Sequence, residues 1–303
     1  MILLIGFILA THGASVLDAI VSVPPWAIAG ATMAHVLTLV LRTEAWRVVL
    51  RGAGAKLDSR SLHAANASAF LAGTVQGQAA MPARIALIRR LGGRDAPEVS
   101  QIALADAPIF MFEVCTSALL AAVASTAVGV IPVWVPWAML AGALAVLAVL
   151  RVVYGRFRNH GFAAGLGVLA DGDLRTKLAL IVGAFTGMAM LRTWIVLAAF
   201  GLPSDAASVC LVLFSMGTVG LLPIGVGTGP AATVAALGAT NLAAATAAGM
   251  VVSTATVLAV LVYAGAFWAL RTRIPAGPGL VVSSRGAAPA RDARRPRTPG
   301  RGR

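Results

Sequence analysis

The chain contains apolar stretches that are each about as long as a lipid bilayer is thick. About 20 apolar residues in a helix cross the hydrocarbon core. The clear stretches are residues 26–50, 102–130, 133–153, 178–200 and 247–270. Charged residues make up only 12% of the 303 residues, about half the share in soluble domains, which is too few to cover a water-exposed surface. The sequence therefore predicts an all-α, polytopic membrane protein.

Weaker segments complete a predicted topology of about seven to eight transmembrane helices plus re-entrant elements. Residues 2–21 form a poor first span, and residues 206–222 precede a Pro/Gly-rich break and a short run to residue 237. Basic residues gather on the cytoplasmic side of membrane proteins. They follow residues 26–50 and again residues 61–81, at Arg47, Arg51, Lys56 and Arg60 and then at Arg84, Arg89, Arg90 and Arg94. Residues 61–81 thus have both ends on one side, so we expect them to re-enter or to lie on the surface. His63 is expected in a solvated loop.

The distribution of charge predicts an integral membrane domain, residues 1–271, and a basic tail, residues 272–303. Nine arginines and one acid, Asp292, lie between Arg271 and Arg303. The tail is rich in Pro, Gly and Ala and lacks apolar periodicity, which predicts disorder. Because it follows a spanning helix, we expect it at the cytoplasmic face of the plasma membrane, bound to anionic lipid rather than to nucleic acid. Cys115 and Cys210 suggest neither a disulfide nor a metal site, and no cofactor is expected.

Two short sequences recur in the two halves of the chain. Residues 70–75 (Phe-Leu-Ala-Gly-Thr-Val) are similar to residues 214–219 (Phe-Ser-Met-Gly-Thr-Val), and Pro82 and Pro223 follow them. A Leu-Arg-Thr sequence precedes each, around Arg42 and Arg192. The first of these helices is predicted to run inward and the second outward, as in the inverted repeats of many transporters. We predict such repeats over residues 1–154 and 175–271, with coincidence in a Gly-, Ala-, Leu- and Val-rich chain as the alternative.

Glu113 is the most informative single residue. It lies 11 residues beyond the start of the 102–130 stretch, about 16 Å into the membrane, where an unpaired carboxylate is costly. Asp106 lies two turns earlier on the same face. We expect a headgroup contact or a proton-coupled site, against the alternative of a protonated carboxyl that a neighbouring helix satisfies. Arg42 and Arg192, about one third of the way in from opposite faces, either snorkel to the interface or bind a lipid phosphate or one of these acids.

Residues 225–230 (Gly-Val-Gly-Thr-Gly-Pro) interrupt the apolar sequence late in the chain. Glycine permits close backbone approach, and proline suits the first turn of a helix. The N-terminus of such a half-helix offers free N–H groups to an anion; the alternative is a kink for tight helix packing. No Gly-x-Ser-x-Gly or His-Glu-x-x-His motif is present, so we do not expect an enzyme.

Four stretches establish a family resemblance: residues 45–50 (Ala-Trp-Arg-Val-Val-Leu), the basic stretch from Pro82 to Arg90, Asp106 in the next helix, and Leu222-Pro223 with the glycines of residues 225–229. In these the chain resembles the transmembrane, flippase-like domain of the lysylphosphatidylglycerol synthase family. The resemblance implies a lipid-translocating domain for aminoacylated phosphatidylglycerol or a related lipid, without the soluble synthase domain. Three ionisable positions of the family pattern are replaced, near residues 86–87, at Ala107 and at residues 231–232.

We therefore predict a lipid translocase, with membrane lipids as partners and a homo-oligomer or a synthase as a further partner. The candidate substrate-binding residues are Arg42, Pro82, Arg84, Arg90, Asp106, Glu113, Arg192, Pro223, Gly225, Gly227 and Gly229. The main alternative is a non-transporting scaffold or degenerate paralogue that partners a lipid-modifying enzyme. A third is an intramembrane enzyme for lipid-linked sugars, for which the sequence offers no clear nucleophile and base.

Overall fold

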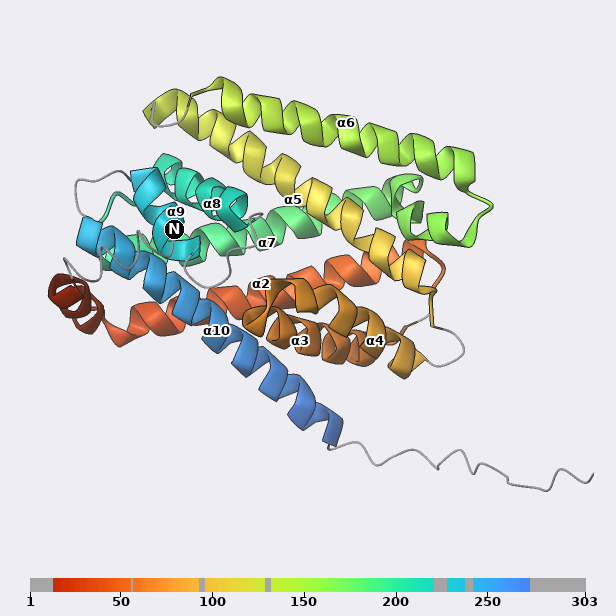
Figure 1. Cartoon of the computed structure of the whole chain (residues 1–303), viewed down its shortest axis with the longest axis horizontal. Helices are drawn as coiled ribbons and strands as arrows, with labels where there is room; N and C mark the ends of the chain where they lie inside the picture. The colour runs from red at the N-terminus through yellow and green to blue at the C-terminus, as the bar shows by residue number, and fades with distance from the viewer. Residues whose placement is uncertain are drawn as a thin grey trace, which may run out of the picture.

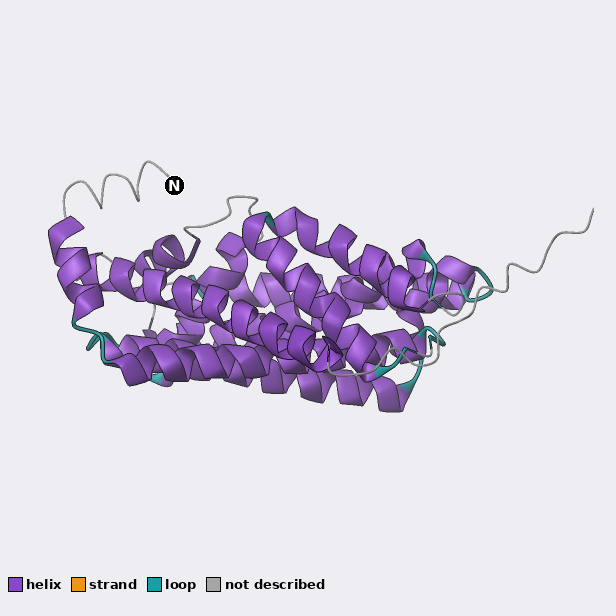
Figure 2. Ribbon diagram, turned by 90° about the horizontal axis from the view of Figure 1, so that it is seen from below, coloured by secondary structure: helices purple, strands orange, loops and turns teal. Residues whose placement is uncertain are grey.

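The computed structural model describes residues 13–55, 57–92, 96–128, 132–220, 228–237 and 242–272, and in these ranges it contains helices and no strand. Residues 13–21 are helical. The elements that follow are α2 (Pro25–Gly52), α3 (Ser59–Val75), η1 (Gly77–Ala79), α4 (Ala80–Gly92), α5 (Val99–Val128), α6 (Trp134–Phe157), η3 (Gly161–Leu169), α7 (Gly172–Ala199), α8 (Ala206–Gly220), α9 (Thr228–Leu237) and α10 (Leu242–Thr272). Figure 2 shows that they form one elongated bundle.

Five helices, α2, α5, α6, α7 and α10, are long and apolar enough to cross a membrane. They coincide with the five clear apolar stretches of the sequence and identify a multi-pass membrane protein. Along the horizontal axis of Figure 1, α2, α6 and α10 run in one direction and α5 and α7 in the other. The weak first span is described only over residues 13–21; its earlier part lies outside the described residues.

Two short helical hairpins accompany these long helices. α3 and α4 pack against each other through η1, and α8 packs against α9. In Figure 1 the first hairpin lies in the half of the bundle where α2 ends, and the second in the opposite half, where α7 ends. The longest of these four helices, α3, has 17 residues, about 25 Å at 1.5 Å per residue, which is short for a span.

An aspartate begins each hairpin in the same way. Asp58 accepts hydrogen bonds from the backbone N–H and the hydroxyl of Ser61 at the start of α3, with 2.7 and 2.6 Å between the heavy atoms. Asp205 accepts from the N–H and the hydroxyl of Ser208 at the start of α8, at 3.0 and 2.7 Å. Such N-caps satisfy donors that the helix itself leaves unpaired. The two hairpins therefore share their local entry chemistry as well as their shape.

The centre of the bundle is an antiparallel pair, α2 and α7, which pack against each other along their length. Trp46 and Val49 of α2 are fully buried against Val182 and Phe185 of α7 in one apolar cluster. At the edge, α6 packs mainly on α5 and η3. Its large apolar side chains, such as Trp134 and Val152, are exposed, as expected for a helix that faces lipid rather than water.

One prediction about the basic segments is wrong. His63 does not lie in a solvated loop; it lies in the first turns of α3 and is only 7% exposed. The basic residues after residue 81 lie in α4, which continues to Gly92 and buries Arg84. The predicted tail, residues 272–303, lies outside the described residues except for Thr272, which ends α10.

Candidate functional site

A cavity of about 480 Å³ lies where the two hairpins approach each other in the middle of the bundle. The end of α3 and the start of α4 line it from one side, and α8 and the start of α9 from the other. The long helices α2, α7 and α10 complete the wall. The lining includes His35, Thr38, Leu39, Arg42, Phe70, Gly73, Thr74, Ala80, Arg192, Met216, Gly229, Ser253 and Thr256. Three of the predicted substrate-binding residues, Arg42, Arg192 and Gly229, thus share one cavity.

Arg192 of α7 is a buried guanidinium without a carboxylate partner among the described residues. Its Nη1 donates to Nδ1 of His35 at 2.8 Å and to Oγ1 of Thr256 at 3.0 Å, while its buried Nε has no partner. Because arginine only donates, His35 must accept at Nδ1 and is neutral. A buried cation normally has a counter-charge, so this site favours an anion.

Arg42 of α2 has the partner that Arg192 lacks. Its Nη1 donates to Oε1 of Glu113 at 3.5 Å, and its Nη2 lies 3.0 Å from Oε2, within ion-pair distance. Each side chain keeps about a third of its surface exposed, at 32% and 31%. The pair borders a second cavity, of about 310 Å³, between α5, α6 and α8. Arg42 and Met216 line both cavities, so the ion pair lies at the boundary between them.

The recurring sequences of the two halves meet at these cavities. Phe70, Gly73 and Thr74 of the first copy line the central cavity. Phe214, Gly217 and Thr218 of the second copy line the adjacent one. Arg42 and Arg192 precede them on the antiparallel helices α2 and α7. The following residues, Thr43 and Thr193, are both buried and bond back to the carbonyl oxygens of Leu39 and Ala189.

The start of α9 packs very closely on α10 at the edge of the central cavity. A Cβ on Gly229 would lie 2.8 Å from the carbonyl oxygen of Gly249, and one on Gly249 would collide with the backbone of Pro230. This contact requires glycine on both helices, as the packing alternative for the Pro/Gly segment expects. It also brings Gly229, in the first turn of α9, to the edge of the cavity. Pro223, Gly225 and Gly227 lie outside the described residues.

Arg84 of α4 lies at a separate buried site. Its Nε donates to Oδ1 of Asn66 at 2.7 Å, and its Nη1 lies 3.8 Å from Oδ1 of Asp106. Its guanidinium also stacks over the Trp46 ring, 4.3 Å from the centroid. Arg84 and Asp106 therefore fix the first hairpin to α2 and α5 and do not line the central cavity. Pro82 and Arg90 lie on the exposed face of α4, also away from the cavity.

The sequence did not predict a largely buried polar cluster of Thr43, Glu44, His63 and Tyr263. Its members come from α2, α3 and α10 and are joined by distances of 2.7–3.4 Å. The only sequence signal was a tyrosine in the apolar stretch of residues 247–270. Without the fold, nothing paired that residue with a histidine 200 positions earlier.

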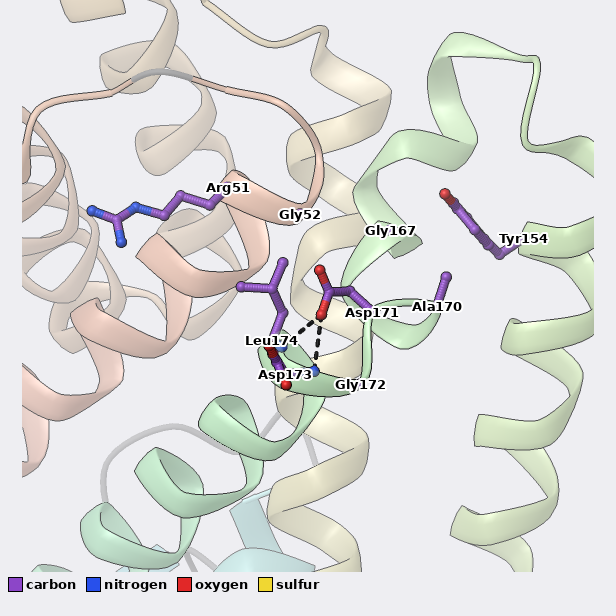
Figure 3. Close-up of a pocket in the computed structure, with 9 residues that line it drawn as sticks. All are labelled: Arg51, Gly52, Tyr154, Gly167, Ala170, Asp171, Gly172, Asp173 and Leu174. Atoms are coloured by element: carbon purple, nitrogen blue, oxygen red, sulfur yellow. Dashed lines mark hydrogen bonds between the residues drawn. The ribbon is translucent and has the colours of Figure 1, made fainter.

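Another pocket, of about 670 Å³, lies away from the hairpins, at the start of α7 (Figure 3). Asp171 uses its carboxylate there to cap α7, accepting from the N–H groups of Asp173 and Leu174. Arg51 extends away from Asp171, and Tyr154 stands on the opposite side (Figure 3). Its polar groups do not converge on one point, so this pocket is a weaker candidate site than the central cavity.

Within the described residues, no group of three or more His, Cys, Asp or Glu side chains could hold a metal ion. Comparison of the chain with known protein families, with curated proteins and with solved structures found no match.

Proposed function

We propose that this protein is a lipid translocase of the flippase-like kind, in which a lipid headgroup crosses the membrane through the central cavity. The observation on which the proposal rests is the buried guanidinium of Arg192, which faces a cavity between two opposed hairpins and has no carboxylate partner among the described residues. The motif resemblance to the flippase-like domain of the lysylphosphatidylglycerol synthase family supports the same function, with aminoacylated phosphatidylglycerol or a related lipid as substrate.

The proposed topology is an inverted repeat in the plasma membrane. The unit α2–α3–α4–α5 corresponds to α7–α8–α9–α10, because each has a long helix with Leu-Arg-Thr, an Asp-capped hairpin and a second long helix. The units run in opposite directions in Figure 1. Both hairpins would be re-entrant, the first from the cytoplasmic side, where Arg47, Arg51 and Arg60 gather, and the second from outside. The basic tail after α10 would then be cytoplasmic.

In the proposed mechanism the headgroup phosphate binds to Arg192. The unused N–H at Nε and the first-turn N–H groups of α9 supply further donors to the phosphate oxygens. Glu113 can leave Arg42 and accept an amino group of the headgroup, while the acyl chains stay in the lipid phase. The hairpins occupy opposite halves of the bundle, so moving one and then the other would open the cavity to each side in turn.

The test is lipid translocation in vesicles that contain the purified full chain and fluorescent phosphatidylglycerol or its aminoacylated form. We expect the wild-type protein to accelerate the exchange of lipid between leaflets. Arg192→Gln should abolish the acceleration, because the amide keeps hydrogen-bonding capacity but lacks the charge. Glu113→Gln should slow the translocation of the aminoacylated lipid more than that of phosphatidylglycerol. Lys177→Gln, an exposed change on the same helix, should have no effect.

Two outcomes would count against the proposal. A wild-type protein that moves neither lipid would exclude the translocase and favour the non-transporting scaffold, which co-purification with a lipid-modifying enzyme would then support. If Arg192→Gln moves lipid at the wild-type rate, the protein is still a translocase, but this cavity is not the path of the headgroup.

A further inference from the structure

Beside the central cavity, hydrogen bonds join Thr43, Tyr263 and His63, and Glu44 lies within ion-pair distance of His63. Thr43 Oγ1 lies 2.8 Å from the hydroxyl of Tyr263. That hydroxyl lies 2.7 Å from Nδ1 of His63, and Nε2 of His63 lies 3.4 Å from Oε1 of Glu44. These four side chains join α3, in the first hairpin, to the long helices α2 and α10. Thr43 and Tyr263 are fully buried, so no bulk water competes for these bonds.

As long as Thr43 donates to Leu39, the donors and acceptors of these four side chains require one extra proton. Thr43 donates its hydroxyl hydrogen to the carbonyl oxygen of Leu39 at 3.0 Å. The Tyr263 hydroxyl must therefore donate to Thr43, and Nδ1–H of His63 must donate to Tyr263. A neutral His63 would then turn the lone pair of Nε2 toward the carboxylate of Glu44, which is repulsive. A second ring proton on Nε2, or a proton on Glu44, removes this conflict.

The same heavy atoms also fit a state with one proton fewer. Neutral His63 then keeps its hydrogen on Nε2 and donates it to Glu44. The Tyr263 hydroxyl turns from Thr43 to Nδ1, and Thr43 turns from the carbonyl of Leu39 to Tyr263. When a proton returns, it forms the N–H bond at Nδ1, and the two hydroxyl hydrogens rotate back; no other covalent bond changes. Protonation and the bond from Thr43 to Leu39 are thus linked.

The surroundings suit a site that exchanges one proton. From α2, Glu44 faces His63 and is itself paired with Arg47, and from α10, Tyr263 faces it. The charges of Glu44 and, from α4, of Arg84 both act on Tyr263. Phe267 stacks on the His63 ring, 4.4 Å between centroids and 4° from parallel, which fixes the ring plane. The Glu44 side chain is 22% exposed, next to the basic end of α2. The Glu44 end of this group of side chains is therefore partly exposed.

We propose that Glu44 and His63 form a proton-binding site that is coupled to the central cavity through Tyr263 and Thr43. Thr43 is the neighbour of Arg42, and both Arg42 and Leu39 line the cavity. Uptake of one proton changes the hydrogen bonding of α2 at the turn that holds the cavity arginine. It also converts the contact between His63 on the first hairpin and Glu44 on α2 into an ion pair. The proton is then the ion that shifts the conformational equilibrium of the first hairpin.

The test is histidine-selective ¹⁵N NMR of the full chain in lipid nanodiscs, between about pH 5 and 8. The His63→Gln variant assigns the His63 signals among the four histidines. We expect the wild-type ring to be protonated on both nitrogens at low pH and on Nε2 alone at high pH. His160, in an exposed turn, serves as the internal reference. A wild-type His63 ring with one constant protonation state over this range would overturn the proposal.

Glu44→Gln gives a sharper second result. The glutamine amide can donate to Nε2 or accept from it, but it lacks the negative charge that stabilises a doubly protonated ring. His63 should then keep a single ring proton at every pH in the range, unlike the wild-type protein at low pH. Tyr263→Phe should leave Nδ1 of His63 without its hydrogen-bond partner, while Nε2–H still points to Glu44. If His63 in the Glu44→Gln variant titrates as it does in the wild-type protein, Glu44 is not a member of the site and the proposal fails.

Discussion

The two halves of the bundle share one arrangement of helices but are held together by different forces. In the first half, Arg42, Arg47 and Arg84 each have a carboxylate within ion-pair distance. In the second half, Arg192 has none among the described residues, and α9 is held against α10 by the direct contact of Gly229 with Gly249. One hairpin is therefore anchored by charge and the other by close backbone packing.

This difference explains where an anion could bind. In the first half, each arginine near the cavity is already neutralised, so a phosphate there would have to displace a carboxylate. In the second half, the positive charge of Arg192 and Gly229 in the first turn of α9 lie at one cavity, whose lining contains no acid among the described residues. The two halves share a fold but differ in how their charges are paired. The charge of Arg192, which has no carboxylate partner among the described residues, therefore places the anion site in the second half.

The strongest test of the charge-anchored half is Arg84→Ala. The change removes the stacking on Trp46 and leaves Oδ1 of Asn66 and the carboxylate of Asp106 without their partner. We expect a loss of about 3 kcal/mol in the free energy of unfolding, measured by thermal unfolding in nanodiscs. Arg89→Ala, at an exposed position of the same helix, should change stability little. Equal effects of the two changes would show that the first hairpin is not anchored by its buried arginine.

The matching test of the second half is Gly249→Ala. The added Cβ would collide with the backbone at Pro230, which no side-chain rotation can relieve. We expect a loss of about 2 kcal/mol, as for other overpacked contacts. Gly265→Ala lies on the same helix with open space around it and should be neutral or slightly stabilising. If Gly249→Ala is as mild as Gly265→Ala, close packing does not hold this hairpin.

Much of the fold follows from the sequence because hydrophobicity and charge act locally. The five long helices coincide with apolar stretches, since only uninterrupted apolar sequence can cross a bilayer. The recurring Leu-Arg-Thr sequences pointed to Arg42 and Arg192, which both line the central cavity.

Partners that are distant in sequence could not be predicted. The positive-inside rule uses Arg84 only as a mark of the cytoplasmic side, whereas the fold buries that residue and stacks it on Trp46. The same reasoning assigned His63 to water, although Phe267 and Tyr263 enclose it. In both cases the fold supplies an aromatic or polar partner that local composition does not show.

A third prediction compares the two cavity arginines directly. Arg192→Leu removes a buried charge that has no counter-charge, so stability should stay unchanged or rise. Arg42→Leu leaves Glu113 unpaired and should cost about 1 kcal/mol, since both side chains are partly exposed. Adding Glu113→Gln should restore most of that loss. The free energies of unfolding of the four proteins test this, and a larger loss for Arg192→Leu than for Arg42→Leu would reverse the proposed asymmetry.

The smallest effect concerns the two aspartate caps, Asp58 and Asp205, which the halves have in common. The hydroxyl and N–H of Ser208 lower the pKa of Asp205. At Asp58, partial burial opposes ionisation, but hydrogen bonds from Ser61 and the charge of Arg60 outweigh it and lower the pKa. A carboxyl whose pKa is lower in the folded state stabilises above its unfolded pKa of about 3.9 and loses that contribution as pH falls through the folded value.

Asp58→Ala and Asp205→Ala should therefore each cost about 0.5 kcal/mol at neutral pH, and the cost should shrink below about pH 4. Salt should separate the two caps. Arg60 assists Asp58 through space, whereas Asp205 depends on hydrogen bonds alone. Raising the salt to about 1 M screens exposed charges, so it should reduce the effect of Asp58→Ala and leave that of Asp205→Ala unchanged. Equal salt sensitivity would mean that the charge asymmetry between the halves does not extend to the entrances of their hairpins.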